Sequence, residues 1–324
     1  MLRVREFLPG IVISVVIAGF AMFVTAWLGG PVIVVALLVG LLCHPWMQSQ
    51  LVYKAGIDWS ASMILRIAVA LLGFRITFAD LGALGWSSTV ALVGVVGAVI
   101  LSGVVLARVT GRPWQLGVLT GGAVGICGAS AAIAIGSMLP GVANRERTIL
   151  LTVIGVTGLS TLAMLVYPWL FLSLGWPDAT IGFALGASIH DVAQVVGAGY
   201  AVSPDAGDVA VLTKMQRVVL LPVVLVILLV TVGRAASGVR IGLPWFVIAF
   251  AFGVVLNSVI PLPAMLVRLL SSVSQWCLII AIAALGLKTS MTTLIRSGGV
   301  VMTMLLIETL LMVGLVLVLV AYGL

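Results

Sequence analysis

Charged residues are scarce in this chain of 324 residues, where only 8% are Asp, Glu, Lys or Arg and nine are acidic. Hydrophobic residues make up 63% of the chain, and the mean hydropathy is +1.35. This composition excludes a soluble globular protein and indicates a multi-pass membrane protein. No polar stretch is long enough to form a separate domain, so the membrane bundle is expected to be the whole protein.

Cysteine and several diagnostic motifs are also scarce or absent. The three cysteines, Cys43, Cys127 and Cys277, lie in apolar segments without CxxC spacing, which indicates neither a disulfide framework nor a zinc site. No GxxxxGK[ST] loop is present, so pumping would need an ion gradient or a partner. The sixteen Lys and Arg residues are scattered in ones and twos, which is typical of topology signals and not of nucleic-acid binding. No cofactor and no metal ion are expected.

Long apolar runs take the place of these features. About eleven windows approach the length of roughly 20 residues that a membrane helix needs. The first follows Arg3 and Arg5 and lacks a convincing cleavage site, so it predicts a membrane helix and not a removed signal peptide. The windows cover residues 7–28, 31–45, 60–78, 88–107, 115–139, 148–172, 179–200, 215–233, 243–260, 271–287 and 298–322. The expected fold class is an all-α polytopic membrane protein.

The first part of the chain repeats in the last part at a constant offset of 213 residues. Prolines, glycines and basic residues coincide, and these match by chance less often than Leu, Val or Ala. The pairs are Leu8-Pro9 with Leu221-Pro222, Pro31 with Pro244, Gly40 with Gly253, Leu72-Gly73 with Leu285-Gly286, and Arg75 with Lys288. We expect one transporter domain, 1–324, with repeats at about 7–107 and 215–322 and a central region at about 115–200. The copies start seven segments apart, an odd number, which predicts inverted repeats if every segment crosses.

The stretch from Leu119 to Gly141, which contains TGGAVGICGAS, cannot form an ordinary spanning helix. Its glycines at 121, 122, 125 and 128 each cost about 1 kcal/mol against alanine in a helix interior. We therefore expect a break here, followed by a cleaner helix from Ala129 to Met138. A half-helix that begins at membrane depth presents unpaired N–H groups and a positive dipole end, which suit an anion.

A second interrupted segment, GFALGASIHDVAQVVGAG, has glycines on both sides of a polar centre. Asp191 and Gln194 are three residues apart and share a helix face, while His190 is offset by about 100°. Ionisable groups at membrane depth are costly and are functional candidates, and a histidine beside a carboxylate is suited to binding a coupling proton. The alternative is structural: Asp191 pairs with a buried base such as Arg66 or Lys214 and locks two helices.

These two segments supply the candidate site, although a tight packing face of small residues is the alternative explanation for the first. The candidate substrate-binding residues are Gly125, Cys127, Gly128, Ala129, Ser130 and Ser188, and the candidates for coupling or a second wall are His190, Asp191 and Gln194. The candidate charge partners are Arg66, Arg75, Lys214 and Lys288. Arg75 and Lys288 are expected near helix ends, where such side chains usually reach the headgroups. Glu308 is alone in its segment and has no predicted partner.

The topology of the two interrupted segments stays open. With the N-terminus inside, a first interrupted segment that crosses fully would place Arg145 and Arg147 outside, against the positive-inside rule. If both are re-entrant, those arginines lie inside, together with Arg234, Arg240 and Arg296. Crossed, broken helices remain an alternative.

At GGAVGICGASAA, SIHDVAQVVGAG, KMQRVVLLPV, LLGFRITFADL and ALGLKTSMTTL, the chain resembles the YeiH-like family of bacterial inner-membrane proteins, described as sulfate exporters. That family is distantly similar to bile-acid/sodium symporters and cation/proton antiporters. The resemblance implies an elevator-like secondary transporter with inverted repeats, a scaffold and a moving core. One departure is that both interrupted segments here lie between the repeats.

We expect secondary transport of a small anion, such as sulfate, sulfite, a sulfonate or an organic carboxylate, coupled to a proton or a sodium ion. An intramembrane enzyme would need His190-Asp191 to converge with Cys127 or Ser130, yet adjacent residues on a helix point apart. A channel or a sensor is a third class. The partners are then the solute, the ion and the lipid bilayer, without nucleic acid. A homodimer is common in such architectures, but no residue requires one.

Overall fold

The computed structural model describes residues 2–28, 31–48, 50–139, 145–232, 244–260, 262–289 and 299–322, and these contain helices and no strand. Seven of the helices are long and apolar enough to cross a membrane, and five further apolar helices are shorter. The predicted all-α membrane class is therefore confirmed. Helix lies in all eleven predicted ranges, but the count of about eleven membrane segments stays a prediction. Arg234, Arg240 and Arg296, which the topology argument used, lie outside the described residues.

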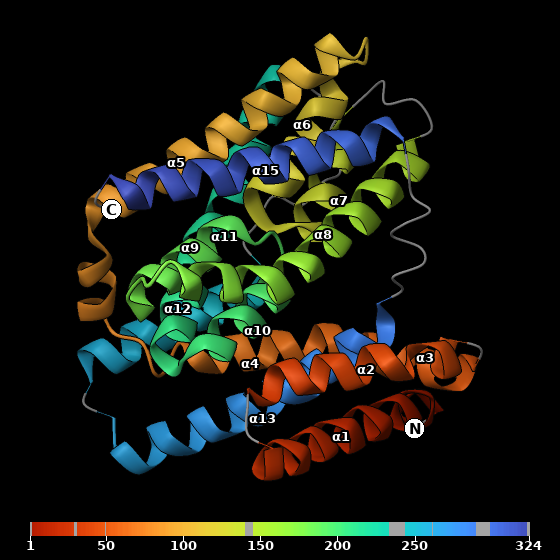
Figure 1. Ribbon diagram of the computed structural model, residues 1–324, viewed down its shortest axis with the longest axis vertical. Coiled ribbons are helices and arrows are strands. Elements are labelled where there is room, and N and C mark those ends of the chain that lie inside the picture. Colours follow the sequence, from red (N-terminus) through yellow and green to blue (C-terminus); the bar gives the residue numbers. More distant parts are fainter. Residues whose placement is uncertain are drawn as a thin grey trace. The chain divides into compact units, whose positions relative to one another are not determined.

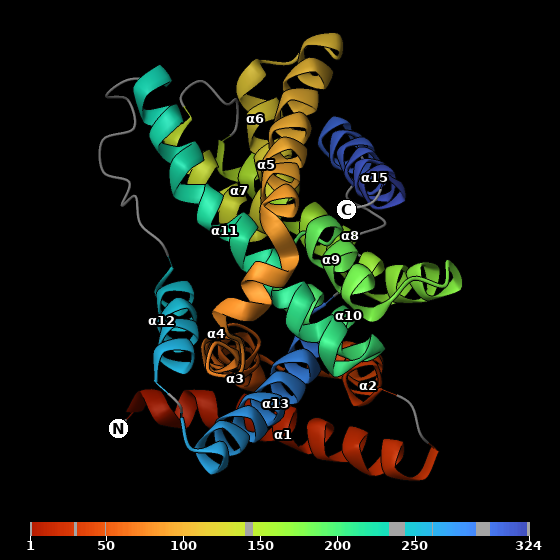
Figure 2. The same cartoon turned by 90° about the vertical axis from the view of Figure 1, so that its left-hand side faces the viewer.

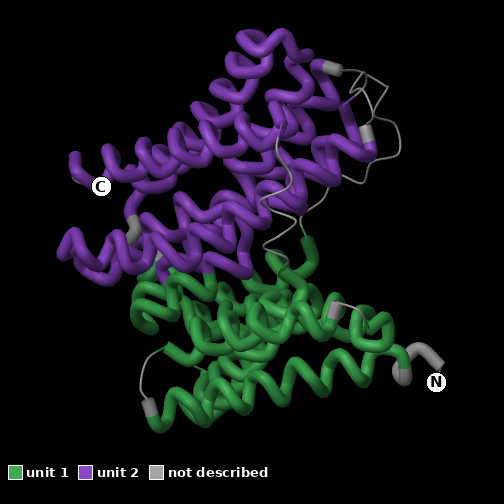
Figure 3. Tube along the Cα trace, turned by 45° about the vertical axis from the view of Figure 1, so that its right-hand side comes forward, with its two compact units in different colours: residues 1–81, 196–208, 244–290 green, residues 82–195, 209–243, 291–324 purple. Residues whose placement is uncertain are grey.

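The chain forms two compact units (Figure 3). Unit 1 comprises residues 1–81, 196–208 and 244–290, and unit 2 comprises residues 82–195, 209–243 and 291–324. The chain passes between the units within three helices, α5 (Phe78–Val109), α10 (Val192–Val202) and α11 (Pro204–Val232).

Unit 1 is built around α13, which packs against α1, α2 and α4 (Figures 1 and 2). Its helices are α1 (Leu2–Leu28), α2 (Val32–Gln48), α3 (Leu51–Trp59), α4 (Leu65–Leu72), α12 (Trp245–Val259) and α13 (Ala264–Lys288). A π-helical turn, Ser60–Ile64, joins α3 and α4 into one span. The predicted range of 60–78 was wrong at both ends. It began too late because the charged residues Lys54 and Asp58 lower the hydropathy of α3, and it ended too late because α4 stops before Gly73.

Two glycine contacts in unit 1 are related by the sequence repeat. A Cβ on Gly286 would lie 2.5 Å from the carbonyl oxygen of Leu37, and a Cβ on Gly73 would lie 2.1 Å from that of Phe250. Leu37 and Phe250 are 213 residues apart, as are Gly73 and Gly286. Each glycine therefore lets one helix approach the backbone of the helix from the other copy, and the two contacts are reciprocal.

Unit 2 contains both helix breaks and most of α5 and α11. Its other helices are α6 (Trp114–Gly122), α7 (Ala129–Met138), α8 (Arg145–Ser173), α9 (Asp178–Ser188) and α15 (Val300–Ala321). The α8 helix packs against α7, α9 and α15, and α15 also contacts α6 and α9. The predicted helix from Ala129 to Met138 is confirmed with both its ends.

The first interrupted segment folds back on itself. A π-helical turn, Ala123–Cys127, follows α6, and α7 starts directly after Gly128. A Cβ on Gly122 would lie 2.3 Å from Cδ1 of Ile135, whereas a continuous helix would separate these residues by about 20 Å at 1.5 Å per residue. Helices α6 and α7 therefore lie side by side, which is the hairpin geometry of the re-entrant alternative.

Candidate functional site

The two helix breaks of unit 2 meet at Gly128 and Asp191. Gly128 has φ 61° and ψ −125°, a backbone conformation that favours glycine because other residues would be strained. A Cβ built on Gly128 would lie 3.3 Å from Cβ and from Cγ of Asp191. The sequence analysis placed the two interrupted segments in one candidate site, and the structure brings these two residues into contact.

Arg217, on α11, binds the backbone carbonyls at both breaks. Its guanidinium donates to Gly125 O at 2.7 and 3.0 Å and to Val124 O at 2.9 Å in the first segment. It also donates to carbonyls at the end of α9, namely Gly186 O at 3.0 Å, Ala187 O at 2.7 Å and Ile189 O at 3.1 Å. Arg217 is fully buried, so the planar fork of five N–H donors is satisfied entirely by protein atoms.

Lys214 makes the same type of connection one helical turn earlier. Its ammonium group donates to Ile126 O at 2.9 Å and to Ile189 O at 2.8 Å, and the side chain is fully buried. Residues three apart share a helix face, so Lys214 and Arg217 present two cationic groups to both breaks. The hydrogen bonds of Lys214 given above are to backbone carbonyls, and its pairing with Asp191 stays a prediction.

These cations satisfy the carbonyl groups that an interrupted helix leaves without partners. The last carbonyl groups of a helix accept no hydrogen bond from the backbone of that helix, and they form the negative end of its dipole. Here the negative ends belong to the α6 segment and to α9. Positive side chains at both ends neutralise them, so the breaks are stable at full burial.

The positive ends of the following half-helices differ from each other. Helix α7 begins at Ala129, its N-cap residue Gly128 has no side chain to cap it, and Ser130 in its first turn is exposed. At α10, the Asp191 carboxylate accepts the Val192 N–H at 3.0 Å, while the Asp191 N–H donates to Ser160 Oγ at 3.0 Å. The start of α10 thus has an anionic cap from the protein itself, and the start of α7 has no side-chain cap.

The other predicted residues of the second segment are buried and held in place. The His190 Nε2 atom lies 3.0 Å from Thr309 Oγ1, whose hydroxyl donates to Leu305 O at 2.6 Å, so the imidazole is the donor to Thr309. Gln194 Nε2 donates to Thr161 Oγ1 at 3.3 Å. Ser188 donates to Ala184 O within its own helix at 2.6 Å, which satisfies the hydroxyl without a ligand.

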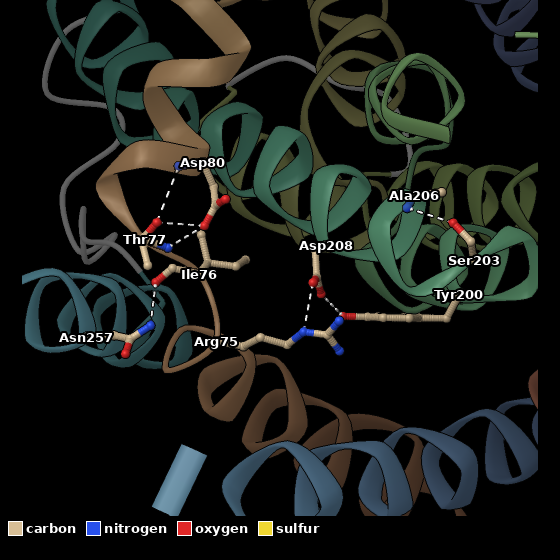
Figure 4. Close-up of polar contacts among 9 residues, drawn as sticks. All are labelled: Arg75, Ile76, Thr77, Asp80, Tyr200, Ser203, Ala206, Asp208 and Asn257. Carbon is tan, nitrogen blue, oxygen red and sulfur yellow. Dashed lines mark hydrogen bonds and ion pairs between the residues drawn. The ribbon is translucent and has the colours of Figure 1, made fainter. Parts of the chain in front are cut away.

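Three of the four predicted charge partners lie in unit 1. Arg66 is exposed, and Lys288 forms an ion pair with Asp58 at 2.8 Å. Arg75 forms an ion pair with Asp208 at 2.8 Å, and Tyr200 donates a hydrogen bond to the same carboxylate (Figure 4). Within unit 1, therefore, Arg75 and Lys288 have acidic partners of their own. Both lie at or just beyond a helix end, as predicted.

Comparison with known proteins gives the family. The chain matches the family described as Conserved hypothetical protein 698 over residues 9–305. It is 41% identical to the UPF0324 membrane protein TauZ of Paracoccus denitrificans over 307 residues, covering 93% of this chain and 91% of that protein. The chain belongs to the UPF0324 family. A UPF0324 membrane protein of Chlorobaculum tepidum is 41% identical, covering 98% of this chain and 90% of the relative.

The predicted resemblance to the YeiH-like family is thereby confirmed. The UPF0324 inner membrane protein YeiH of Escherichia coli K12 is 32% identical over 321 residues, covering 93% of this chain and 90% of that protein. Together with the seven helices that are able to cross a membrane, this places the UPF0324 chain in the bacterial inner membrane as a multi-pass protein.

Arg217 of this UPF0324 chain is not among the predicted site residues, although it lies inside the predicted eighth segment at 215–233, which left out Lys214. Helix α11 instead begins at Pro204, which places Lys214 and Arg217 together inside the helix. The missed signal was Ser203-Pro204-Asp205, since Ser203 Oγ accepts the Ala206 N–H at 3.1 Å and proline is favoured in a first helical turn.

Proposed function

We propose that this protein is a secondary active transporter for a small anion, bound in unit 2 where Gly128 and Asp191 meet. The observation that supports this most is the contact between two helix breaks whose carbonyl ends are already neutralised by Lys214 and Arg217. The positive end of α7 is left without a side-chain cap. An anion is the ligand that such a helix start favours.

The local charge supports an anion over a cation. Arg217 stays positively charged in proteins, and Lys214 as an ammonium adds a second positive charge against the single carboxylate of Asp191. A cationic solute would have to approach two buried cations and the positive ends of two helices. An anionic solute is attracted by all of these groups and is repelled by Asp191.

We assign the solute to the oxyanions of sulfur and the related sulfonates, with small organic carboxylates as the runner-up. The sulfur assignment follows the sulfate-exporter description of the YeiH-like family, whereas the charge of the site suits either class. The exposed Ser130 hydroxyl and the N–H groups of the first turn of α7 would bind the anion. His190, Asp191 and Gln194 would form the opposite wall or bind a coupling ion.

Inverted repeats are part of the proposal. In support, α2 and α12 begin at Val32 and Trp245, and α3 and α13 begin at Leu51 and Ala264, each pair at the offset of 213 residues. The reciprocal contacts of Gly73 with Phe250 and of Gly286 with Leu37 are what a two-fold relation between the copies predicts. Eleven hydrophobic segments, of which the two interrupted ones are both re-entrant, complete the topology.

An elevator-like mechanism is the form of transport that we propose. Both breaks belong to unit 2, while unit 1 has continuous spans crossing at glycines, as expected of a scaffold. An enzyme is less well supported, because the contact that holds His190 is with Thr309 and not with a nucleophile activated for attack.

Counterflow in proteoliposomes tests the function. Vesicles containing the purified protein would be loaded with unlabelled sulfate, sulfite, taurine or succinate and diluted into the labelled anion. We expect a transient, saturable accumulation with one anion class, as a carrier requires. Flux that never saturates would indicate a channel, and the absence of counterflow with every anion would contradict anion transport.

A further inference from the structure

Glu308, on α15 of unit 2, is a fully buried carboxyl group outside the paired breaks. Its Oε1 atom lies 2.7 Å from Thr120 Oγ1 on α6, and its Oε2 atom is buried without a hydrogen-bond partner among the described residues. An ionised carboxylate with one hydroxyl donor and no cation is poorly stabilised at such burial. Either a bound proton or a bound cation has to compensate the carboxylate.

The contacts of Thr120 distinguish between these two. The Thr120 Oγ1 atom also lies 3.2 Å from Leu116 O and 3.4 Å from Gly117 O, but its hydroxyl has a single proton to donate. If the acid is protonated, Glu308 donates to Thr120 and Thr120 donates to the Leu116 carbonyl, so every group in the chain is satisfied. If the acid is ionised, the Thr120 hydroxyl donates its proton to Glu308 instead, and the Leu116 carbonyl loses this hydrogen bond.

Glycines hold the surroundings of this carboxyl group tight. A Cβ on Gly103 of α5 would lie 2.7 Å from Glu308 Oε1 and 2.3 Å from Gly117 O. Helices α5 and α6 thus cross directly beside the carboxyl group, with no side chain between them. A site this narrow is suited to a proton, and the described residues around it do not supply the several oxygen ligands that a metal cation requires.

Few other charged groups reach this part of α15. The neighbouring Thr309 contacts His190 of the second break, and Met312 Sδ lies 3.4 Å from the Arg217 guanidinium. Of the elements packed against α15, α6 has no ionisable residue and the π-helical turn after it has Cys127. The ionisable residues of α8, α9 and α5 lie mostly toward the ends of these helices. They are Arg145, Glu146, Arg147 and Tyr167 on α8, Asp178 on α9, and Asp80 and Arg108 on α5.

We infer that Glu308 is an exchangeable proton-binding site that couples anion movement to a proton, and this coupling rests on the proposed transport function. The proton-binding carboxyl group lies beside two threonines, each of which is linked to one of the breaks. Thr120 lies on α6, four residues before the Val124 carbonyl that binds Arg217, and Thr309 holds His190. Loss of the proton changes the Thr120 bond within α6, and thereby connects the charge of Glu308 to the first break.

Infrared spectroscopy of the purified full-length protein tests the site without any anion. We expect a carboxylic-acid C=O band at mildly acidic pH that is lost in Glu308→Gln, retained in the matched exposed control Glu146→Gln, and lost in the wild type on mild alkalisation. A band that survives Glu308→Gln, or one that persists at every pH where the protein is folded, would overturn the inference. If Glu308→Gln fails to fold, Thr120→Val gives the answer, because removal of its hydroxyl shifts a Glu308 band and leaves any other band unchanged.

Transport then tests the coupling. In proteoliposomes, Glu308→Gln should keep sulfate counterflow and lose accumulation driven by a pH gradient, whereas Glu146→Gln should keep both. Wild-type accumulation that is equal with and without the pH gradient would overturn the coupling. If no anion shows counterflow, the proposed transport function is contradicted. The infrared result does not depend on transport, so the proton-binding site would still be supported.

Discussion

Gly128 lies directly against Asp191, and this contact joins the break before α7 to the break before α10. The two residues are 63 positions apart in sequence, yet a single methyl group on Gly128 would fill the space between them. The positive start of one half-helix is thus adjacent to the carboxylate that caps the other. Any anion bound at α7 must be accommodated beside this carboxylate.

Replacement of Gly128 by alanine should destabilise the protein. Its φ of 61° with ψ −125° is a strained region for any other residue, which costs about 1–3 kcal/mol, and the added methyl group would lie 3.3 Å from Asp191. Thermal unfolding in detergent measures the change. Gly94→Ala is the matched control in unit 2, since nothing lies within 4 Å of a Cβ built there. Equal stability of the two variants would contradict the contact.

Arg217→Lys should be strongly destabilising although it preserves the charge. Lysine cannot reach carbonyls of both segments with a planar fork, so several buried carbonyls lose their donors and the expected cost is about 3–5 kcal/mol. The control is Arg147→Lys, at an exposed position on α8. Chemical unfolding of both variants gives the difference. A loss below about 1 kcal/mol for Arg217→Lys, the scale of one ordinary hydrogen bond, would show that the carbonyl contacts are dispensable.

The repeat-related cations of unit 1 should differ in the strength of their ion pairs. The side chains of Arg75 and Asp208 are 36% and 22% exposed, against 54% and 42% for Lys288 and Asp58. Exposed pairs contribute about 0.2–1 kcal/mol, and screening weakens the more exposed pair. Double-mutant cycles should therefore give a larger coupling energy for Arg75 with Asp208. The reverse order, or equality, would argue against the geometry in Figure 4.

The glycine contacts of unit 1 should respond as a pair. Gly73→Ala and Gly286→Ala each push a methyl group into a carbonyl oxygen, at 2.1 and 2.5 Å, and overpacking of this kind costs about 1–3 kcal/mol. Thermal unfolding should show similar losses for both and little change for Gly19→Ala, where nothing lies within 4 Å. A large loss for one glycine and none for the other would contradict the reciprocal contacts.

The local features of the breaks could be predicted from sequence. Four clustered glycines are poor helix formers, so the interruption and the clean helix from Ala129 to Met138 followed from composition alone. The polar centre at His190 and Asp191 marked the second break in the same way. Such signals depend on neighbouring residues, and periodicity and propensity describe neighbours well.

The partners of these breaks could not be predicted, because they are far apart in sequence. Arg217 binds carbonyls of residues 124, 125, 186, 187 and 189, and a backbone carbonyl has no residue-type signature that marks it as an acceptor. The predicted eighth segment began at residue 215 and so separated Lys214 from Arg217, which share a face of α11. The bond between Glu308 and Thr120 is likewise a tertiary contact without a local signal.

The central claim is that an anion binds at the paired breaks, and ligand-dependent thermal stability tests it most directly. The purified protein would be unfolded with sulfate, sulfite, thiosulfate, taurine, succinate or chloride at matched ionic strength. An anion at a hundred times its dissociation constant should stabilise the fold by about 2.7 kcal/mol. We predict such a shift for one anion class, and its loss in a Ser130→Ala variant that still folds. No shift with any anion, in mildly acidic or mildly alkaline buffer and with or without sodium, would contradict the account.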